Sequence, residues 1–252
     1  MREKKSSLWL AILPSGLFIS LIGLLIWGIQ TMDYPWDFTF LQSFIWNETG
    51  PGILLQGLWN TLWISLLSIL GGSILGVIFG ILLTFKSKIL HTILVFYVDV
   101  FRNTPFLVQI YVIFFVLGTV LHLSAWEAGI LGLILFSAAS IAELVRGVLV
   151  QFEKGQIMAA QSLGLTPLQI AWHIIFPQAM KRVLPGLVGQ YVALIKDSSL
   201  ISVIGIDELA KTASQISAVT FKNLETWIAV ACIYFIINTF LTSCSRLLER
   251  KL

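Results

Sequence analysis

Charged residues interrupt apolar stretches of this chain in several places. Asp99 and Arg102 are three residues apart, and Glu143 and Arg146 repeat that spacing. Residues at this spacing share one face of a helix, so each couple can form an ion pair. Because a charge among apolar groups is costly, such residues either tie helices together or serve a charged solute. The sequence leaves both interpretations open.

A further polar cluster, Lys196-Asp197-Ser198-Ser199, interrupts another apolar run. Lys196 and Asp197 are adjacent, so on a helix their side chains point in different directions. We expect the cluster to line a path or form a gate. The alternative is a set of hydrogen bonds between helices.

The segment Asn103-Thr104-Pro105 predicts a broken helix, because proline lacks an N–H and clashes with the preceding turn. Thr104 is the expected N-cap, and the second half is expected to begin at Pro105. The N-terminus of a half-helix carries partial positive charge and can hold a carboxylate. We therefore expect Asn103, Thr104 and Pro105, with Arg102 and Gln109 nearby, to line a path for a solute that carries one.

Signatures of catalysis are missing from the sequence. There is no phosphate-binding loop, no serine nucleophile elbow and no His-Glu zinc helix. His91, His122 and His173 lack the spacing of metal ligands, and Cys232 and Cys244 are about 18 Å apart if they share a helix. We expect no enzyme activity, no metal site, no cofactor and no disulfide.

These residues must be positioned by a very apolar chain. Of its 252 residues, 57% are hydrophobic and 12% charged, and the mean hydropathy is +0.90. Soluble domains carry roughly 25% charged residues. The apolar runs are long and continuous rather than alternating, which predicts an all-α, polytopic membrane protein. Basic residues are scattered at the ends of these runs, so nucleic-acid binding is not expected.

Six apolar segments are each long enough to cross a bilayer, namely 8–29, 53–85, 91–121, 127–150, 178–204 and 224–247. The first exceeds the roughly 7–15-residue apolar core of a signal peptide, so we expect a retained anchor helix. Lysines and arginines cluster at alternate ends of the segments, which predicts that both termini are cytoplasmic. The cytoplasmic group comprises Arg2, Lys4, Lys5, Lys86, Lys88, Lys154, Lys181, Arg182, Arg246, Arg250 and Lys251.

A less apolar stretch, 155–177, separates the fourth and fifth segments. Gly164 suits the end of a helix, since glycine tolerates a left-handed conformation. Thr166, Pro167 and Gln169 form the pattern of a capping box with proline at the first helical position. The stretch therefore predicts two short helices joined by a sharp turn, on the cytoplasmic side.

Residues Ala159, Ala160, Gly164, Ile174 and Pro177 occur in this stretch at the spacing found in the coupling loop of the membrane subunits of bacterial ABC importers. The chain resembles that family, which implies that the loop docks on an ATPase. The contacts implied by this resemblance are Gly155, Gln156, Met158, Ala159, Ala160, Leu163, Gly164, Thr166 and Pro167.

The family has a glutamate where this chain has Met158. This difference moves the expected ATPase contact from a charge pair to the small face formed by Ala159 and Ala160.

Three other stretches, 97–109, 142–156 and 196–209, are similar to polar amino acid permeases. The resemblance implies an importer of a polar amino acid such as glutamate, glutamine, histidine or arginine in the bacterial inner membrane, and the extra N-terminal span resembles forms found in glutamate or aspartate systems. It also implies several partners: two ATPase copies, a second permease subunit (identical or paralogous), a periplasmic or lipid-anchored binding protein, and membrane lipid.

The expected organisation is an anchor helix with an outer loop (1–52) and an importer domain (53–250) whose coupling loop is 153–177. The alternative function is a stand-alone secondary carrier driven by an ion gradient. Such carriers usually contain internal repeats, and no clear repeat occurs here.

Overall fold

The computed structural model describes residues 20, 23–24, 27–28, 31, 34–48, 50–152 and 154–249. The chain forms two units, 1–38 and 39–252. Most of the predicted anchor helix, 8–29, lies outside the described residues. In the first unit, the ring of Trp36 contacts those of Tyr34 and Phe38 at centroid distances of 4.9 and 6.2 Å.

The second unit begins with α2 (Leu41–Ile45) and a small antiparallel pair of strands, β1 (Trp46–Asn47) and β2 (Gly50–Pro51). The sequence placed these residues with the anchor helix. In the structure Phe40 and Phe44 pack on the same cluster as Leu54 of the following helix, so 39–52 belongs with the larger unit.

The remaining elements are helices, and many of them are long and apolar. They are α3 (Ile53–Leu82), α4 (Lys88–Asn103), α5 (Phe106–Val112), the π-helix η1 (Ile113–Leu117), α6 (Gly118–Leu121) and α7 (Ala125–Val150). They continue with α8 (Lys154–Ser162), α9 (Pro167–Ile170), the π-helix η2 (Ala171–Ile175), α10 (Phe176–Asp197), the 3₁₀-helix η3 (Ser198–Ile204), α11 (Leu209–Thr220) and α12 (Asn223–Glu249).

Among the described residues, four helical stretches are long and apolar enough to cross a membrane: Ile53–Leu82, Ala125–Val150, Pro167–Ile204 and Asn223–Cys244. The predicted third span, 91–121, is instead a bent pair. Lys88–Asn103 and Phe106–Leu121 meet at 113°. The predicted helix break at Asn103–Pro105 is therefore present.

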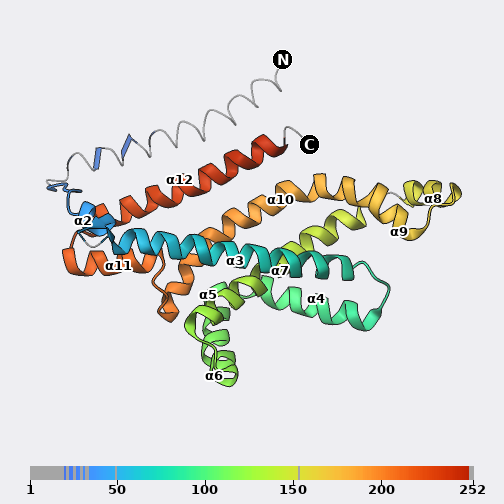
Figure 1. Cartoon of the computed structure of the whole chain (residues 1–252), viewed down its shortest axis with the longest axis horizontal. Coiled ribbons are helices and arrows are strands. Elements are labelled where there is room, and N and C mark those ends of the chain that lie inside the picture. Colours follow the sequence, from blue (N-terminus) through green and yellow to red (C-terminus); the bar gives the residue numbers. More distant parts are fainter. Residues whose placement is uncertain are drawn as a thin grey trace, which may run out of the picture. The chain divides into compact units, whose positions relative to one another are not determined.

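Helices α3 and α7 run side by side through this unit (Figure 1). Their contact is close because glycines of α3 face larger residues of α7. A Cβ built on Gly80 would lie 2.6 Å from the Cβ of Val145. Small residues permit this approach of two helices in a membrane. α8 and α9 lie at one end of the unit and α11 at the other (Figure 1).

We expect Gly76→Ala to lower the thermal midpoint of the purified protein, measured by tryptophan fluorescence. The added Cβ would lie 2.6 Å from the Cβ of Ile141 and 3.0 Å from the carbonyl oxygen of Ala138. Overpacking of this kind costs about 1–3 kcal/mol. Gly147→Ala is the matched control, because a Cβ there meets no atom within 4 Å. An equal loss in both variants would contradict the packing argument.

Candidate functional site

Glu143 of α7 lies between two arginines. Its carboxylate accepts hydrogen bonds from Arg146, with Nη2–Oε1 at 2.6 Å and Nε–Oε2 at 3.2 Å. Arg102, in the last turn of α4, approaches the same carboxylate at 3.9 Å. The bidentate contact fixes Glu143, whereas Arg102 is held by one long contact and keeps most of its five donors free.

The predicted pair between Asp99 and Arg102 is not formed. α4 packs against α7, which brings Glu143 within reach of Arg102. Among the described residues Asp99 has no ion pair, and its side chain is exposed. Asp99 and Arg102 therefore present opposite charges one helical turn apart, neither neutralising the other.

The break between α4 and α5 differs from the expected one in its capping. The backbone of Thr104 is extended, with φ −118° and ψ 147°, as is usual before proline. Its hydroxyl donates to the carbonyl of Val100 at 2.7 Å, so Thr104 closes α4 rather than starting α5. Pro105 occupies the N-cap position, and α5 begins at Phe106.

Gln109 stabilises this break and does not line an open path. It is 7% exposed. Its Nε2 lies 2.8 Å from the carbonyl oxygen of Phe101, 3.0 Å from that of Thr104 and 2.7 Å from the Thr104 hydroxyl. The carbonyl of Phe101 is one of the last in α4, and that of Thr104 follows the helix directly, so neither has the usual helical N–H partner. Gln109 thus holds the bend from its buried side.

The other side of the break is exposed. Asp99, Arg102, Asn103, Thr104 and Pro105 are all exposed. The flanking surfaces of α4 and α5 are apolar and equally exposed, with Ile93, Phe96, Val108 and Val112 between 52% and 70% exposed. The break is therefore a polar patch within an apolar face.

The predicted Lys196–Ser199 cluster lies where α10 changes into η3. The hydroxyls of Ser198 and Ser199 donate to the carbonyls of Ile195 and Lys196, at 2.8 and 2.7 Å. Both hydroxyls thus form hydrogen bonds within their own helical segment and do not join two helices. Lys196 is exposed and Asp197 is half-buried. Within this cluster, only the charged side chains of Lys196 and Asp197 remain available to a solute.

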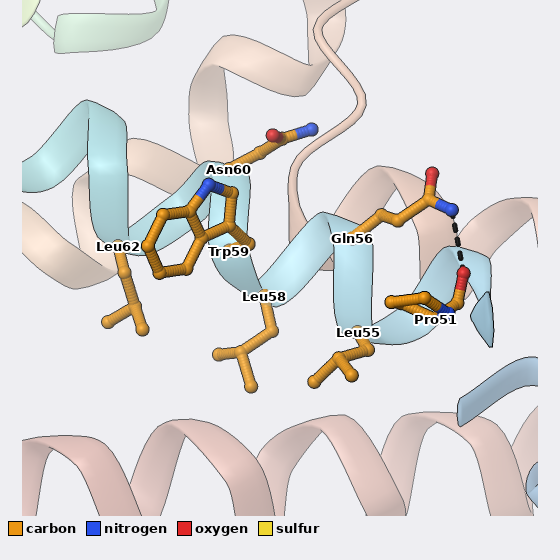
Figure 2. A pocket seen from close by; sticks show the side chains of 7 residues that line it. All are labelled: Pro51, Leu55, Gln56, Leu58, Trp59, Asn60 and Leu62. Atoms are coloured by element: carbon orange, nitrogen blue, oxygen red, sulfur yellow. Dashed lines mark hydrogen bonds between the residues drawn. The ribbon is translucent and has the colours of Figure 1, made fainter. Parts of the chain in front are cut away.

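A cavity of about 530 Å³ lies at the start of α3, away from the polar patch at the break between α4 and α5. Figure 2 shows Leu55, Leu58 and Leu62 pointing to one side of α3, while Gln56 and Asn60 point away from them. The amides of both donate to backbone carbonyls, of Pro51 and Asp207 respectively. No charged residue is among the described lining residues, so this cavity does not suit a charged solute.

The less apolar stretch forms the two predicted short helices. Gly164 joins them with φ +78°. Thr166 and Gln169 form the expected capping box, with Thr166 N–Oε1 at 2.8 Å and Gln169 N–Oγ1 at 3.4 Å. The second helix, α9, does not end before the next span. It continues through η2 into α10, so α9 belongs to the same helical stretch as the next span, Pro167–Ile204.

The exposed face of this loop differs in part from the expected one. Ala160 is 3% exposed and packs inward, so it is not available to a partner. Met158, Leu163 and Leu168 are 59%, 82% and 69% exposed. Gly155, Gln156, Ala159, Gly164, Thr166 and Pro167 are exposed as well. The outward face therefore presents three large apolar side chains beside its small and polar ones, and is richer in large side chains than the sequence suggested.

The structure points to a further residue, Glu208, which the sequence did not mark as a candidate site residue. Its carboxylate is fully buried and caps α11, accepting from the N–H groups of Ala210 and Lys211 at 2.8 and 2.7 Å. It also accepts from the hydroxyl of Tyr234 on α12 at 3.1 Å. The adjacent Leu209 N–H donates to Thr61 of α3. The sequence signal that could have identified Glu208 is an acidic residue directly before a run of apolar residues at helical spacing.

Burial raises the pKa of the Glu208 carboxyl, although its hydrogen bonds act in the opposite direction. A carboxyl with a raised folded-state pKa contributes stability below its unfolded pKa, and this is lost as pH rises through the folded value. We therefore expect the thermal midpoint of the unmodified protein to fall relative to that of Glu208→Gln as pH rises above about 4.3. If the thermal midpoints of the two proteins depend on pH in the same way, the pKa of the Glu208 carboxyl is not raised in the folded protein.

Comparison with known proteins agrees with this architecture. Residues 72–252 match the family model described as "binding-protein-dependent transport system inner membrane component". The glutamine transport system permease protein GlnP of Escherichia coli K12 is 36% identical over 216 residues, covering 84% of this chain and 99% of the relative. The arginine transport system permease protein ArtQ of Bacillus subtilis is 34% identical over 203 residues, covering 79% and 92%.

Solved structures give the same result for the fold. The crystal structure of an amino acid ABC transporter with histidines superposes with a TM-score of 0.78 at 29% identity, covering 87% of this chain and all of that one. The MetNI methionine ABC transporter has a TM-score of 0.69 at 22% identity, covering 79% and 95%, and shows the fold alone. The chain belongs to the family of inner membrane components of binding-protein-dependent transport systems.

Proposed function

We propose that this chain is the permease subunit of an ATP-driven importer for a polar amino acid, which it contacts at the exposed break between α4 and α5. The carrying observation is the pair of exposed opposite charges, Asp99 and Arg102, which do not pair with each other and lie one turn apart in an otherwise apolar face. Side chains at this spacing are about 5–6 Å apart at Cβ. An amino acid carries an ammonium and a carboxylate, and these charges complement Asp99 and Arg102.

The polar groups next to Arg102 extend this site. Asn103 and Thr104 are exposed beside it. Glu143 orients the guanidinium without neutralising it fully, since it is already paired with Arg146. The names of the relatives favour glutamine or arginine as substrate. Glutamine fits better, because it adds no cation to a site that contains two arginines.

The partners follow from the surfaces. The apolar face of the loop, centred on Leu163 and Leu168, suits docking of an ATPase, and a family of permeases implies that ATP is hydrolysed in a separate subunit.

The exposed apolar face of α4 and α5 suits a second permease subunit, identical or paralogous, which would enclose the polar patch. The family description names dependence on a binding protein, which we place at the end of the unit opposite the loop. Both termini are cytoplasmic in this arrangement.

Reconstituted transport tests the proposal. The chain is incorporated into proteoliposomes with its ATPase and binding protein, and uptake of labelled amino acids is measured. We expect uptake of a polar amino acid that requires all components and internal ATP. Uptake by the chain alone, driven by an ion gradient, would establish the alternative of a secondary carrier. Family membership already disfavours that alternative.

A further inference from the structure

Arg146 lies on α7, three residues beyond Glu143, and binds the carboxylate that Arg102 also approaches. Both of its contacts are hydrogen bonds, with Nη2–Oε1 at 2.6 Å and Nε–Oε2 at 3.2 Å. The contact of Arg102 with the same carboxylate, Nη1–Oε2, measures 3.9 Å, which is longer than a hydrogen bond. One carboxylate is therefore shared unequally between two arginines.

Other contacts hold α4 against α7. The hydroxyl of Tyr97 on α4 donates to the carbonyl of Leu135 on α7 at 2.6 Å, and an apolar cluster around Ala142 joins the two helices. Glu143 and Arg146 belong to the same helix, so their pair joins no two helices. A pair at this spacing also adds little to the stability of its own helix. Helix packing therefore does not account for Arg146.

The two arginines compete for Glu143. A carboxylate accepts most strongly from a guanidinium that presents two N–H groups, and Arg146 engages both of its oxygens in this way. The side chain of Arg102 stays 47% exposed. Without Arg146, a shift of about 1 Å from the present 3.9 Å would bring Arg102 to the roughly 2.7–2.9 Å of a charge-assisted hydrogen bond with Glu143. The carboxylate of a substrate would then have to displace Glu143.

We infer that Arg146 is a positioning residue that sets the affinity for the substrate by limiting the hold of Glu143 on Arg102, an inference that rests on the proposed binding of a substrate carboxylate by Arg102. Arg146 acts through Glu143 and needs no contact with the substrate. Its charge also offsets that of Glu143, so Asp99 and Arg102 are the charges that an amino acid meets at the break.

Equilibrium binding of labelled L-glutamine to the purified permease–ATPase complex, without a binding protein, tests this role. Arg146→Met removes the charge and the donors but keeps a long side chain. We expect it to weaken glutamine binding about fivefold, the upper end of what an exposed ion pair contributes, because the substrate must then compete with Glu143. Arg146→Lys should give an intermediate affinity, since lysine keeps the charge but lacks the planar fork.

A second substitution separates capture of Arg102 from a direct contact and from loss of structure. Glu143→Gln removes the charge that would capture Arg102, so Glu143→Gln/Arg146→Met should bind glutamine within about twofold of the unmodified complex. An arginine that touched the substrate itself, or that only supported the fold, would not be rescued in this way. Arg246→Met, in the last turn of α12, is the matched control for the loss of one exposed arginine and should bind as the unmodified complex does.

Arg102→Ala distinguishes failure of this role from failure of the proposed site. If the unmodified complex binds no glutamine, or if Arg102→Ala binds it unchanged, the substrate does not contact the break between α4 and α5. If Arg102→Ala loses binding but Arg146→Met does not, or if the double variant stays as weak as Arg146→Met, the positioning role of Arg146 is wrong. Where Arg146→Met lowers the thermal midpoint strongly, Arg146→Lys with and without Glu143→Gln decides by the same comparison.

Discussion

Replacing Arg102 with alanine is expected to lower ATP-driven amino acid uptake by about 10- to 150-fold. The estimate follows from the roughly 1.5–3 kcal/mol that a hydrogen bond to a charged group contributes. Arg102 has one contact, at 3.9 Å to Glu143, so its removal leaves the shorter Glu143–Arg146 bonds in place. Arg102→Lys should recover part of the activity, because lysine keeps the charge but lacks the planar fork.

The control for Arg102 is an exposed arginine in another helix. Arg246→Ala, in the last turn of α12, should leave uptake unchanged. Asp99→Asn should weaken uptake of the same substrate, since it removes the charge that faces the ammonium. If Asn103→Ala and Thr104→Ala both retain full flux along with Arg102→Ala, the substrate does not pass this break.

A substrate analogue separates binding from structural support. Glutamine α-amide lacks the carboxylate, so the unmodified transporter should discriminate strongly against it. Arg102→Ala should lose that discrimination, because the partner of the carboxylate is gone. A merely structural arginine would lower transport of both compounds equally.

The bend between α4 and α5 could be predicted because its cause is local. Pro105 lacks an N–H for the helical hydrogen bond and disfavours a helical conformation of the residue before it. The capping role of Thr104 was wrong for an equally local reason, since the residue before proline is extended and so ends the preceding helix. The partner of Arg102 was not predictable, because it depends on how α4 packs on α7.

The stretch 155–177 likewise combines features that the sequence predicts with features that depend on packing. Gly164, Thr166 and Gln169 set the turn and the cap through their own backbone chemistry, and the structure contains both. Ala160 is buried because α8 folds onto its neighbours, and no pattern in the sequence distinguishes it from the exposed Ala159.

The helix α11 is absent from the predicted apolar segments. It has 12 residues and is too short to span a bilayer. Glu208 caps it locally, whereas its contacts with distant parts of the chain are the bond from Leu209 to Thr61 of α3 and that from Tyr234 of α12 to Glu208. A buried carboxylate is rare, and only the folded chain supplies the donors that offset its desolvation.

Introducing a charge at Leu163 is expected to separate the permease from its ATPase. Leu163 is 82% exposed at the C-terminal end of α8 and is the most exposed large apolar residue of the loop. Its burial in a partner's groove would contribute about 1.5–3 kcal/mol, and a buried unpaired carboxylate would cost more. Leu163→Glu should therefore reduce ATPase co-purification at least about tenfold and abolish ATP-driven uptake.

Phe221→Glu is the matched control, because Phe221 is 84% exposed and follows a helix at the opposite end of the unit. It should leave ATPase binding intact, and both variants should keep the thermal midpoint of the isolated permease. If Leu163→Glu keeps its ATPase while Met158→Glu loses it, the contact centres on α8 and not on the turn. If neither substitution weakens ATPase binding, the ATPase docks elsewhere, and α9 cannot be the element that transmits its movement to α10.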